Sequence, residues 1–284
     1  VAIILFEGGL TLELKELKTS GTVVARLVTV GALVSWALTA LVAYFVLGLD
    51  VRLAVLLGAI LVVTGPTVVA PLLRHIRPAR RIGSIAKWEG IVIDPIGALL
   101  AVLVFEEFMF SIGEHTFGNA VWLLLKTALV GGVLGGAAAW LLAQCLRRYW
   151  LPDFLHGVAF LTVALAAFAI SNWLQEESGL FTVTLLGVIL ANTKGIRVHH
   201  VLEFKEHLGV LLISCLFIVL GSRLELQDLL KVGPSGMVFL VFLVVLIRPA
   251  AVFASTFGSE LTWRERVFLA FLAPRGIVAA AVAS

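Results

Sequence analysis

The chain has 284 residues, of which 61% are hydrophobic and 14% charged, and its formal net charge at pH 7 is +3. A water-soluble domain is roughly 45–50% apolar and about 25% charged. The composition therefore excludes a soluble enzyme and predicts that lipid covers much of the surface. The small positive charge is spread over loops, which argues against nucleic-acid binding. We expect an all-α, polytopic membrane protein whose main partner is the lipid bilayer.

Ten apolar runs predict helices that cross, or partly cross, a membrane. A hydrocarbon core about 30 Å thick needs about 20 helical residues. The first and last runs meet the chain ends within apolar sequence, so we expect further segments beyond both ends. In chain order the predicted helices are Val1–Leu10, Val23–Leu47, Leu53–Leu73, Ile85–Phe108, Ala120–Leu146, Phe154–Trp173, Leu180–Ala191, Leu208–Leu220, Met237–Phe257 and Val267–Ser284.

The loops between these runs alternate between basic and acidic composition. The densest basic loop, residues 74–87, holds four arginines and Lys87, and the next loop carries Glu106, Glu107 and Glu114. Cytoplasmic loops carry an excess of lysine and arginine. We therefore expect the 74–87 loop to face the cytoplasm.

The sequence carries an internal repeat at an offset of 212 residues. Gly9–Gly21 matches Gly221–Gly233 at glycine, leucine and acidic positions, and Leu49–Leu57 matches Leu261–Leu269. An apolar-biased sequence also produces chance matches, which is the alternative interpretation. The matched segments lie an odd number of helices apart, so the two halves would have inverted topology.

Corresponding helices of the two halves are interrupted at similar positions. Thr64-Gly65-Pro66 breaks the third predicted helix, and Ala273-Pro274-Arg275-Gly276 breaks the tenth. Paired breaks of this kind indicate a transport site near the membrane midplane. We therefore divide one transmembrane domain, residues 1–284, into most of a first repeat (1–108), a linking helix (120–146) and most of a second repeat (153–284).

Six ionisable side chains fall inside the predicted helices. Each costs at least about 2.5–3.5 kcal/mol near the bilayer centre, so each is a functional candidate. We expect Lys126 to extend toward the membrane surface and Glu7 to lie at the interface. The six residues are Glu7, Glu89, Asp94, Lys126, Arg248 and Arg275.

Asp94 is the strongest of these candidates. Pro95 follows it and cannot donate a backbone hydrogen bond, which leaves the carbonyl of Ile91 free one turn below the carboxylate. A buried carboxylate beside free carbonyls can replace the water around a monovalent cation, and it can also accept a proton. The alternative is a structural ion pair between Asp94 and an arginine. Prolines that would likewise free a carbonyl four residues earlier are Pro66, Pro249 and Pro274.

Glu89 lies five residues before Asp94, about 140° round the same helix. The two carboxylates therefore do not share a face. We expect Glu89 to form an ion pair with Arg248, and we regard it as the second candidate for proton binding after Asp94.

These motifs resemble the NhaP/NHE-type cation:proton antiporters. The segment Trp88–Asp94 is similar to the family's helix with a glutamate followed by asparagine-aspartate, and Thr64-Gly65-Pro66 is similar to its threonine-aspartate-proline break. Phe6–Leu10, Arg248 and Arg275-Gly276 also fall where the family has like motifs. The resemblance covers the whole chain.

The resemblance implies an NhaA/NhaP-like antiporter fold of thirteen helices, with inverted repeats and two crossed broken helices, of which this chain holds about ten. It implies a homodimer in a bacterial inner membrane, a core domain that moves against a dimer domain, and a C-terminal cytoplasmic regulatory domain beyond this chain. It implies no cofactor, since Na+ or K+ and H+ are the transported ions. By resemblance, Asp94 binds cation and proton in turn, the Thr64 carbonyl lies near the ion, and Pro66, Pro274 and Gly276 lie at the breaks.

Three departures from the family pattern affect the expected function. Gly65 stands where the family has an aspartate, so Arg275 loses its usual partner, and Ile93 and Gly90 replace an asparagine and a serine. The last two changes remove polar atoms near the ion, which makes K+ an alternative to Na+. With Glu89 paired, one titratable carboxylate remains, which predicts electroneutral exchange of one cation for one proton.

Two other functions are compatible with the same broken helices. A sodium-coupled transporter of organic anions could use Arg275 to bind a substrate carboxylate, but nothing else in the sequence forms an anion pocket. A channel is disfavoured by the charged, proline-broken midplane and the inverted repeat.

Overall fold

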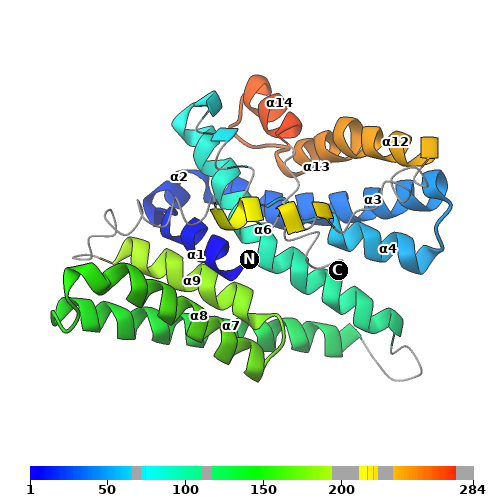
Figure 1. Cartoon of the computed structure of the whole chain (residues 1–284). Coiled ribbons are helices and arrows are strands. Elements are labelled where there is room, and N and C mark those ends of the chain that lie inside the picture. The colour runs from blue at the N-terminus through cyan, green and yellow to red at the C-terminus, as the bar shows by residue number, and fades with distance from the viewer. Residues whose placement is uncertain are drawn as a thin grey trace. The chain divides into compact units, whose positions relative to one another are not determined.

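The computed structural model describes residues 1–65, 69, 72–73, 75–109, 117–193, 211–215, 217–219, 221–222 and 233–272, and the regular secondary structure of these residues is helical throughout (Figure 1). Among the described residues, five helices are long and apolar enough to cross a membrane, which confirms the predicted polytopic class. They span Leu14–Leu47, Arg80–Glu106, Leu125–Arg147, His156–Leu174 and Gly233–Ser255. Two shorter apolar helices span Val51–Ile60 and Ser178–Asn192.

The chain divides into two compact units, and each combines segments from distant parts of the sequence. The first unit consists of Val1–Glu16 and Gly113–Cys215, and the second of Leu17–Ile112 and Leu216–Ser284. The division of the sequence into repeats at 1–108, 120–146 and 153–284 stays a prediction.

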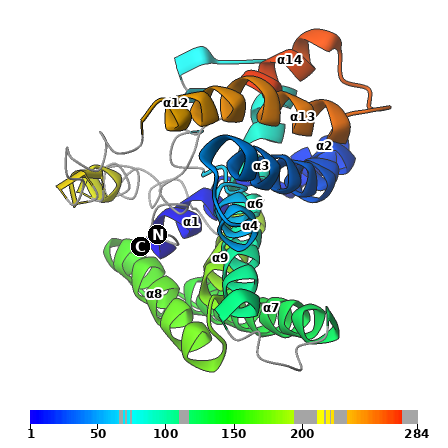
Figure 2. The ribbon, with the colours of Figure 1, turned by 90° about the vertical axis from the view of Figure 1, so that its right-hand side faces the viewer.

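The first unit is built around one buried helix. Helix α9 (Ser178–Asn192) contacts α1 (Ala2–Leu10), α7 (Phe117–Arg147) and α8 (His156–Leu174). Helices α7, α8 and α9 lie side by side in both ribbon views (Figures 1 and 2). The backbones of α1 and α9 approach closely, because a Cβ on Gly9 would lie 2.6 Å from the Thr184 carbonyl oxygen.

Asn192 joins the end of α9 to the turn between α1 and α2 (Leu14–Arg26). Its Nδ2 donates to the carbonyls of Leu12 and Val188 at 2.9 and 2.8 Å, and its Oδ1 accepts from the Leu14 N–H at 2.8 Å. The amide therefore supplies a partner to an N–H group at the start of α2 that has no partner within its own helix.

Two long helices of the second unit each contain a π-helical turn. The first consists of α2, η1 (Leu27–Gly31) and α3 (Ala32–Leu47). The second consists of α12 (Gly233–Phe242), η3 (Leu243–Ile247) and α13 (Arg248–Ser255), and Figure 2 shows it as one rod. The second unit also contains α4 (Val51–Ile60), α6 (Arg80–Met109) and α14 (Trp263–Phe271).

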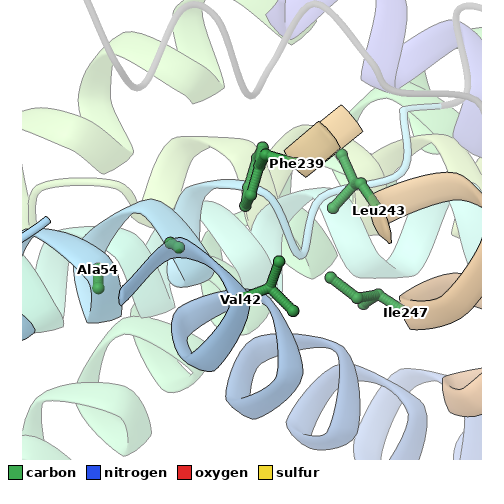
Figure 3. Packing of buried hydrophobic residues seen from close by; sticks show 6 residues of the cluster. Val42, Ala54, Phe239, Leu243 and Ile247 are labelled. Atoms are coloured by element: carbon green, nitrogen blue, oxygen red, sulfur yellow. The ribbon is translucent and has the colours of Figure 1, made fainter. Parts of the chain in front are cut away.

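An apolar core joins these two long helices to α4. Val42 and Ala43 of α3, Ala54 of α4, Phe239 of α12, and Leu243 and Ile247 of η3 form one buried cluster (Figure 3). Elsewhere α3 and α4 cross closely, since a Cβ on Gly58 would lie 2.9 Å from the Trp36 carbonyl oxygen. The Trp36 indole also donates to the Val55 carbonyl at 3.0 Å. These contacts fix α4 up to the point where it ends.

The segments matched by the 212-residue offset have corresponding boundaries. Helix α4 begins after the N-cap Asp50, and α14 begins after the N-cap Thr262, at the equivalent position. Each of the two preceding long helices is followed by a glycine with positive φ, Gly48 at 65° and Gly258 at 70°. A left-handed residue after a helix is a common way to end it.

Several predicted helix boundaries were wrong. The helix expected from Val23 begins at Leu14, because its polar first turns form an amphipathic helix that hydropathy alone misses. The first half of the broken helix predicted over Leu53–Leu73 ends at Ile60, before the predicted break at Thr64. Helix α6 begins five residues before Ile85, and α14 begins four residues before Val267. The chain after Leu272, and most of residues 208–220, lie outside the described residues.

Candidate functional site

A buried ion pair joins α6 to α13. The Arg248 guanidinium binds the Glu89 carboxylate with both of its terminal nitrogens: Nη1 donates to Oε1 at 2.5 Å and Nη2 to Oε2 at 2.9 Å. Glu89 is 4% exposed and Arg248 is 8% exposed. Two parallel charge-assisted hydrogen bonds are the strongest arrangement open to these side chains. The predicted pairing of Glu89 with Arg248 is present in the structure.

The π-helical turn η3 immediately precedes Arg248. The Arg248 N–H bonds to the carbonyl of Leu243, five residues earlier, instead of the carbonyl four residues earlier. A π turn inserts one residue into a helix and is often found at functional sites. Pro249 follows and could not have donated to the preceding turn. The helix thereby brings Arg248 onto its buried side, together with Ile247 and Ala251.

Asp94 lies in α6, on the C-terminal side of Glu89, and is fully buried. Neither of its carboxylate oxygens has a hydrogen-bond partner within the described part of the chain. The helix continues through Pro95. A buried carboxylate is normally paired or bound to a cation, because an isolated charge in an apolar setting is costly. Asp94 therefore has the capacity to bind a proton or a cation.

A structural ion pair between Asp94 and Arg248 is ruled out by these contacts. Both terminal nitrogens of Arg248 are engaged by Glu89. Among the described residues no arginine donates a hydrogen bond to the Asp94 carboxylate, and Arg275 lies outside them.

The chain loses helical structure immediately after α4. Leu61 and Val62 form a closing turn, in which their N–H groups donate to the carbonyls of Leu57 and Ala59 at 3.0 and 3.3 Å. Residues 63–65 have no regular structure. Thr64, in this segment, is 5% exposed, and its hydroxyl has no hydrogen-bond partner among the described residues. The break thus begins earlier than Thr64, and it carries a second buried polar group.

Helix α6 packs tightly on this break at Gly97. A Cβ built on Gly97 would overlap Cγ2 of Val63, the residue before Thr64. Sequence reasoning missed this contact. The signal it could have used is a small residue three positions after Asp94, on the same face of α6.

The other predicted site residues are described in part. Gly65 lies in the break, and Ile93 is buried next to Asp94. Pro66, Pro274, Arg275 and Gly276 lie outside the described residues, so their part in the site stays a prediction. The described residues contain no cluster of three histidines, cysteines or carboxylates that could hold a metal ion. A joint cation site of Asp94 and Thr64 stays a prediction.

Comparison with known proteins assigns the chain to a family. The family model described as sodium/hydrogen exchanger, transmembrane, matches residues 1–284. The K(+)/H(+) antiporter NhaP of Alkalimonas amylolytica is 26% identical over 282 residues, which is 98% of this chain and 48% of that protein. The Na(+)/H(+) antiporter 1 of Methanocaldococcus jannaschii is 25% identical over 287 residues, which is 99% of this chain and 67% of that protein.

The fold agrees with this assignment. The structure of the sodium proton antiporter MjNhaP1 from Methanocaldococcus jannaschii at pH 8 aligns with a TM-score of 0.84 and 23% identity, over 99% of this chain and 70% of that one. The predicted NhaP-like fold is therefore confirmed. The chain spans about half the length of the NhaP relatives from Alkalimonas amylolytica and Shewanella oneidensis, 48% in each case. On the match over its whole length, the chain belongs to the family of transmembrane sodium/hydrogen exchangers.

Proposed function

We propose that the chain forms the ion-translocating part of a secondary transporter that exchanges a monovalent cation, Na+ or K+, for H+ by alternating access. The observation that carries this proposal is the fully buried Asp94 carboxylate on a membrane-spanning helix, without a hydrogen-bond partner among the described residues. Membership of the exchanger family supports the same function.

Asp94 is the group for which the two ions compete. When Asp94 is protonated, the buried site is neutral and stable without further ligands. When the proton leaves to one side of the membrane, the carboxylate binds a cation, and oxygen atoms of the break around Thr64 replace part of its hydration shell. The site is thus neutral in both loaded forms. The empty, charged form is too costly to cross the membrane interior.

The Glu89–Arg248 pair has a different part in this mechanism. Because its charges cancel and its hydrogen bonds are internal, it need not exchange protons during transport. It holds α6 against α13, so that Asp94 keeps its position relative to the helices of the second unit. We assign it a positioning role.

We infer the range of cations that the site accepts from the polar atoms near Asp94. Relatives include proteins named as K(+)/H(+) antiporters and one named as a Na(+)/H(+) antiporter. In this chain Ile93 and Gly65 supply no side-chain ligand. Na+ holds its water more strongly than K+, so a site with few polar ligands recovers less of the dehydration cost for Na+. The proposed cargo therefore includes K+ as well as Na+.

The two compact units fit the domains expected for such a transporter. We infer that the unit with Asp94 is the core domain that moves and that the unit with α7, α8 and α9 forms the dimer domain. Helix α7 supports this inference because it presents large apolar side chains on its surface, which suit lipid or a second copy of the chain. These side chains are Trp122, Leu125, Leu129, Val133 and Trp140.

We propose a multi-pass protein of a bacterial inner membrane, with a cytoplasmic regulatory domain beyond this chain.

The proposed function is tested in everted membrane vesicles that contain the intact protein. Respiration acidifies the vesicle interior and quenches a pH-sensitive dye. Addition of NaCl or KCl should restore the fluorescence, because entering cations exchange for internal protons, whereas choline chloride should not. Sodium-dependent uptake of an organic anion such as succinate, without dequenching by either cation, would overturn antiport in favour of organic-anion transport.

The exchange should be electroneutral. Glu89 is held in its ion pair, Ile93 and Gly65 cannot titrate, and Asp94 alone alternates between one proton and one monovalent cation. We expect the exchange rate in proteoliposomes to be unchanged when an ionophore clamps the membrane potential at different values. If the rate follows the imposed potential, a second proton-carrying group takes part, and Glu89 is the first residue to replace.

A further inference from the structure

The closest contact between α6 and the break after α4 involves a glycine. Gly97 lies three residues after Asp94, and a Cβ at this position would overlap Cγ2 of Val63. It would also lie 3.5 Å from both the Cβ and the backbone nitrogen of Val63. Val63 is branched at Cβ and has few alternative rotamers, so it cannot easily swing aside. Any larger residue at position 97 would push α6 and the break apart.

On each side of this contact lies a buried polar group of the site that has no hydrogen-bond partner among the described residues. On α6, Asp94 and Gly97 are neighbours on one helix face, since residues three apart are adjacent. On the break, Thr64 directly follows Val63. Asp94 is fully buried and Thr64 is 5% exposed, and neither side chain has a hydrogen-bond partner among the described residues. The apolar contact between Gly97 and Val63 therefore limits how closely α6, which carries Asp94, approaches the break, which carries Thr64.

We propose that Gly97 is a specificity-determining residue, which sets the width of the cation site and thereby the size of the cation that the site prefers. This inference rests on the proposed antiport function. A narrow site brings oxygen ligands to the short distances that a small cation requires, whereas a wider one favours a larger cation. Gly97 itself does not touch the ion. It acts by allowing α6 to approach the break.

The first test replaces Gly97 by alanine in the intact protein. The Gly97→Ala variant should widen the site, so that the ratio of apparent affinities for K+ over Na+, measured by dye dequenching, rises roughly tenfold, as expected for one methylene group in a packed site. The matched control is Gly83→Ala on the same helix. A Cβ on Gly83 would lie 3.8 Å from the nearest atom, Cγ of Pro78, which is ordinary contact. This control should leave the ratio unchanged.

A second variant shifts the preference in the opposite direction. Val63→Ala removes the atom that a Cβ on Gly97 would meet, so the break can move closer to α6. The ratio should then shift toward Na+. The double variant Gly97→Ala/Val63→Ala should return close to the wild-type ratio. If Gly97→Ala alone does not fold, the double variant must fold, as judged by its melting temperature in detergent, because the overlap is gone.

The outcomes separate this inference from the proposed function. Wild-type protein that exchanges neither cation for protons would overturn the proposed function and this inference with it. Wild-type protein that exchanges cations, while Gly97→Ala has the same affinity ratio as Gly83→Ala, would overturn this inference alone. A double variant that remains as altered as Gly97→Ala would also overturn it, because the effect would not then arise at Val63.

Discussion

Asp94→Asn should reduce the exchange of every monovalent cation for protons to the background of vesicles without the protein. The asparagine keeps the shape of the side chain but can neither bind a proton nor carry the negative charge that a cation needs. Folding should be retained, since Asp94 is fully buried and its carboxylate has no hydrogen-bond partner among the described residues. A neutral amide costs less to bury than a carboxylate. The melting temperature in detergent should therefore equal or exceed that of the wild type.

The matched control for this variant is Glu106→Gln, which makes the same chemical change near the C-terminal end of α6. Glu106 is partly exposed, so its loss should leave exchange unchanged. If Asp94→Asn retained cation-dependent dequenching while folding normally, the ions would bind elsewhere, and the assignment of Asp94 would be wrong. A variant that neither folds nor transports would point to a structural role for the carboxylate.

Removal of either partner of the Glu89–Arg248 pair should destabilise the protein strongly. Glu89→Gln leaves the guanidinium buried without a counter-charge, and Arg248→Gln does the same to the carboxylate. Breaking a buried pair from one side typically costs about 3–5 kcal/mol. We expect a large fall in melting temperature and in the yield of folded protein for each single variant. The double variant should be more stable than the sum of the two losses predicts, because it leaves no isolated charge.

An exposed ion pair in the same unit supplies the control. Arg81 and Glu260 are 3.4 Å apart, and their side chains are 32% and 90% exposed. Such pairs contribute about 0–1 kcal/mol. Glu260→Gln should therefore change the melting temperature little. Strict additivity of the Glu89 and Arg248 variants would mean that the two residues are energetically independent, in spite of their contact.

The ion pair could be predicted from the sequence, because the angle between two residues round a helix depends only on their separation along the chain. A separation of five residues turns Glu89 away from Asp94, and a buried carboxylate then needs one of the few buried arginines. The structure contains the pair with Arg248. The remaining roles, above all those of Thr64, Arg275 and Gly276, stay predictions, because they depend on how separate segments meet around an ion.

Features that depend on packing between distant segments could not be predicted in the same way. Glycine and proline marked the break near Thr64, but α4 ends four residues earlier, after Gly58 has packed against Trp36. The contact of Gly97 with Val63 could not be predicted from local helix propensity, because the two residues belong to segments far apart in the chain. The hydrogen bonds of Asn192 likewise join segments far apart in the sequence. Hydropathy also missed the first turns of α2, whose exposed polar residues precede the buried positions Ser20, Val23 and Val24.

The π-helical turns η1 and η3 lie within rows of buried residues spaced four apart. One row consists of Val23, Leu27, Gly31, Ser35, Thr39 and Ala43, and the other of Phe239, Leu243, Ile247, Ala251 and Ser255. In an unbroken α-helix each step of four residues moves such a row about 40° further round the axis. A π turn uses an additional residue and so reverses part of this drift.

The length of these two segments is therefore as important as their composition. Conservative substitutions within Leu27–Gly31 or Leu243–Ile247 do not change the number of residues. The row of buried residues then continues to face the rest of the protein. Because each π turn already holds one extra residue, insertion of a further residue into either segment would rotate everything that follows by about 100°. In the second segment, that rotation would carry Arg248 away from Glu89 and toward the lipid. The number of residues in Leu243–Ile247 therefore fixes where the charge of Arg248 lies, whichever apolar side chains fill the segment.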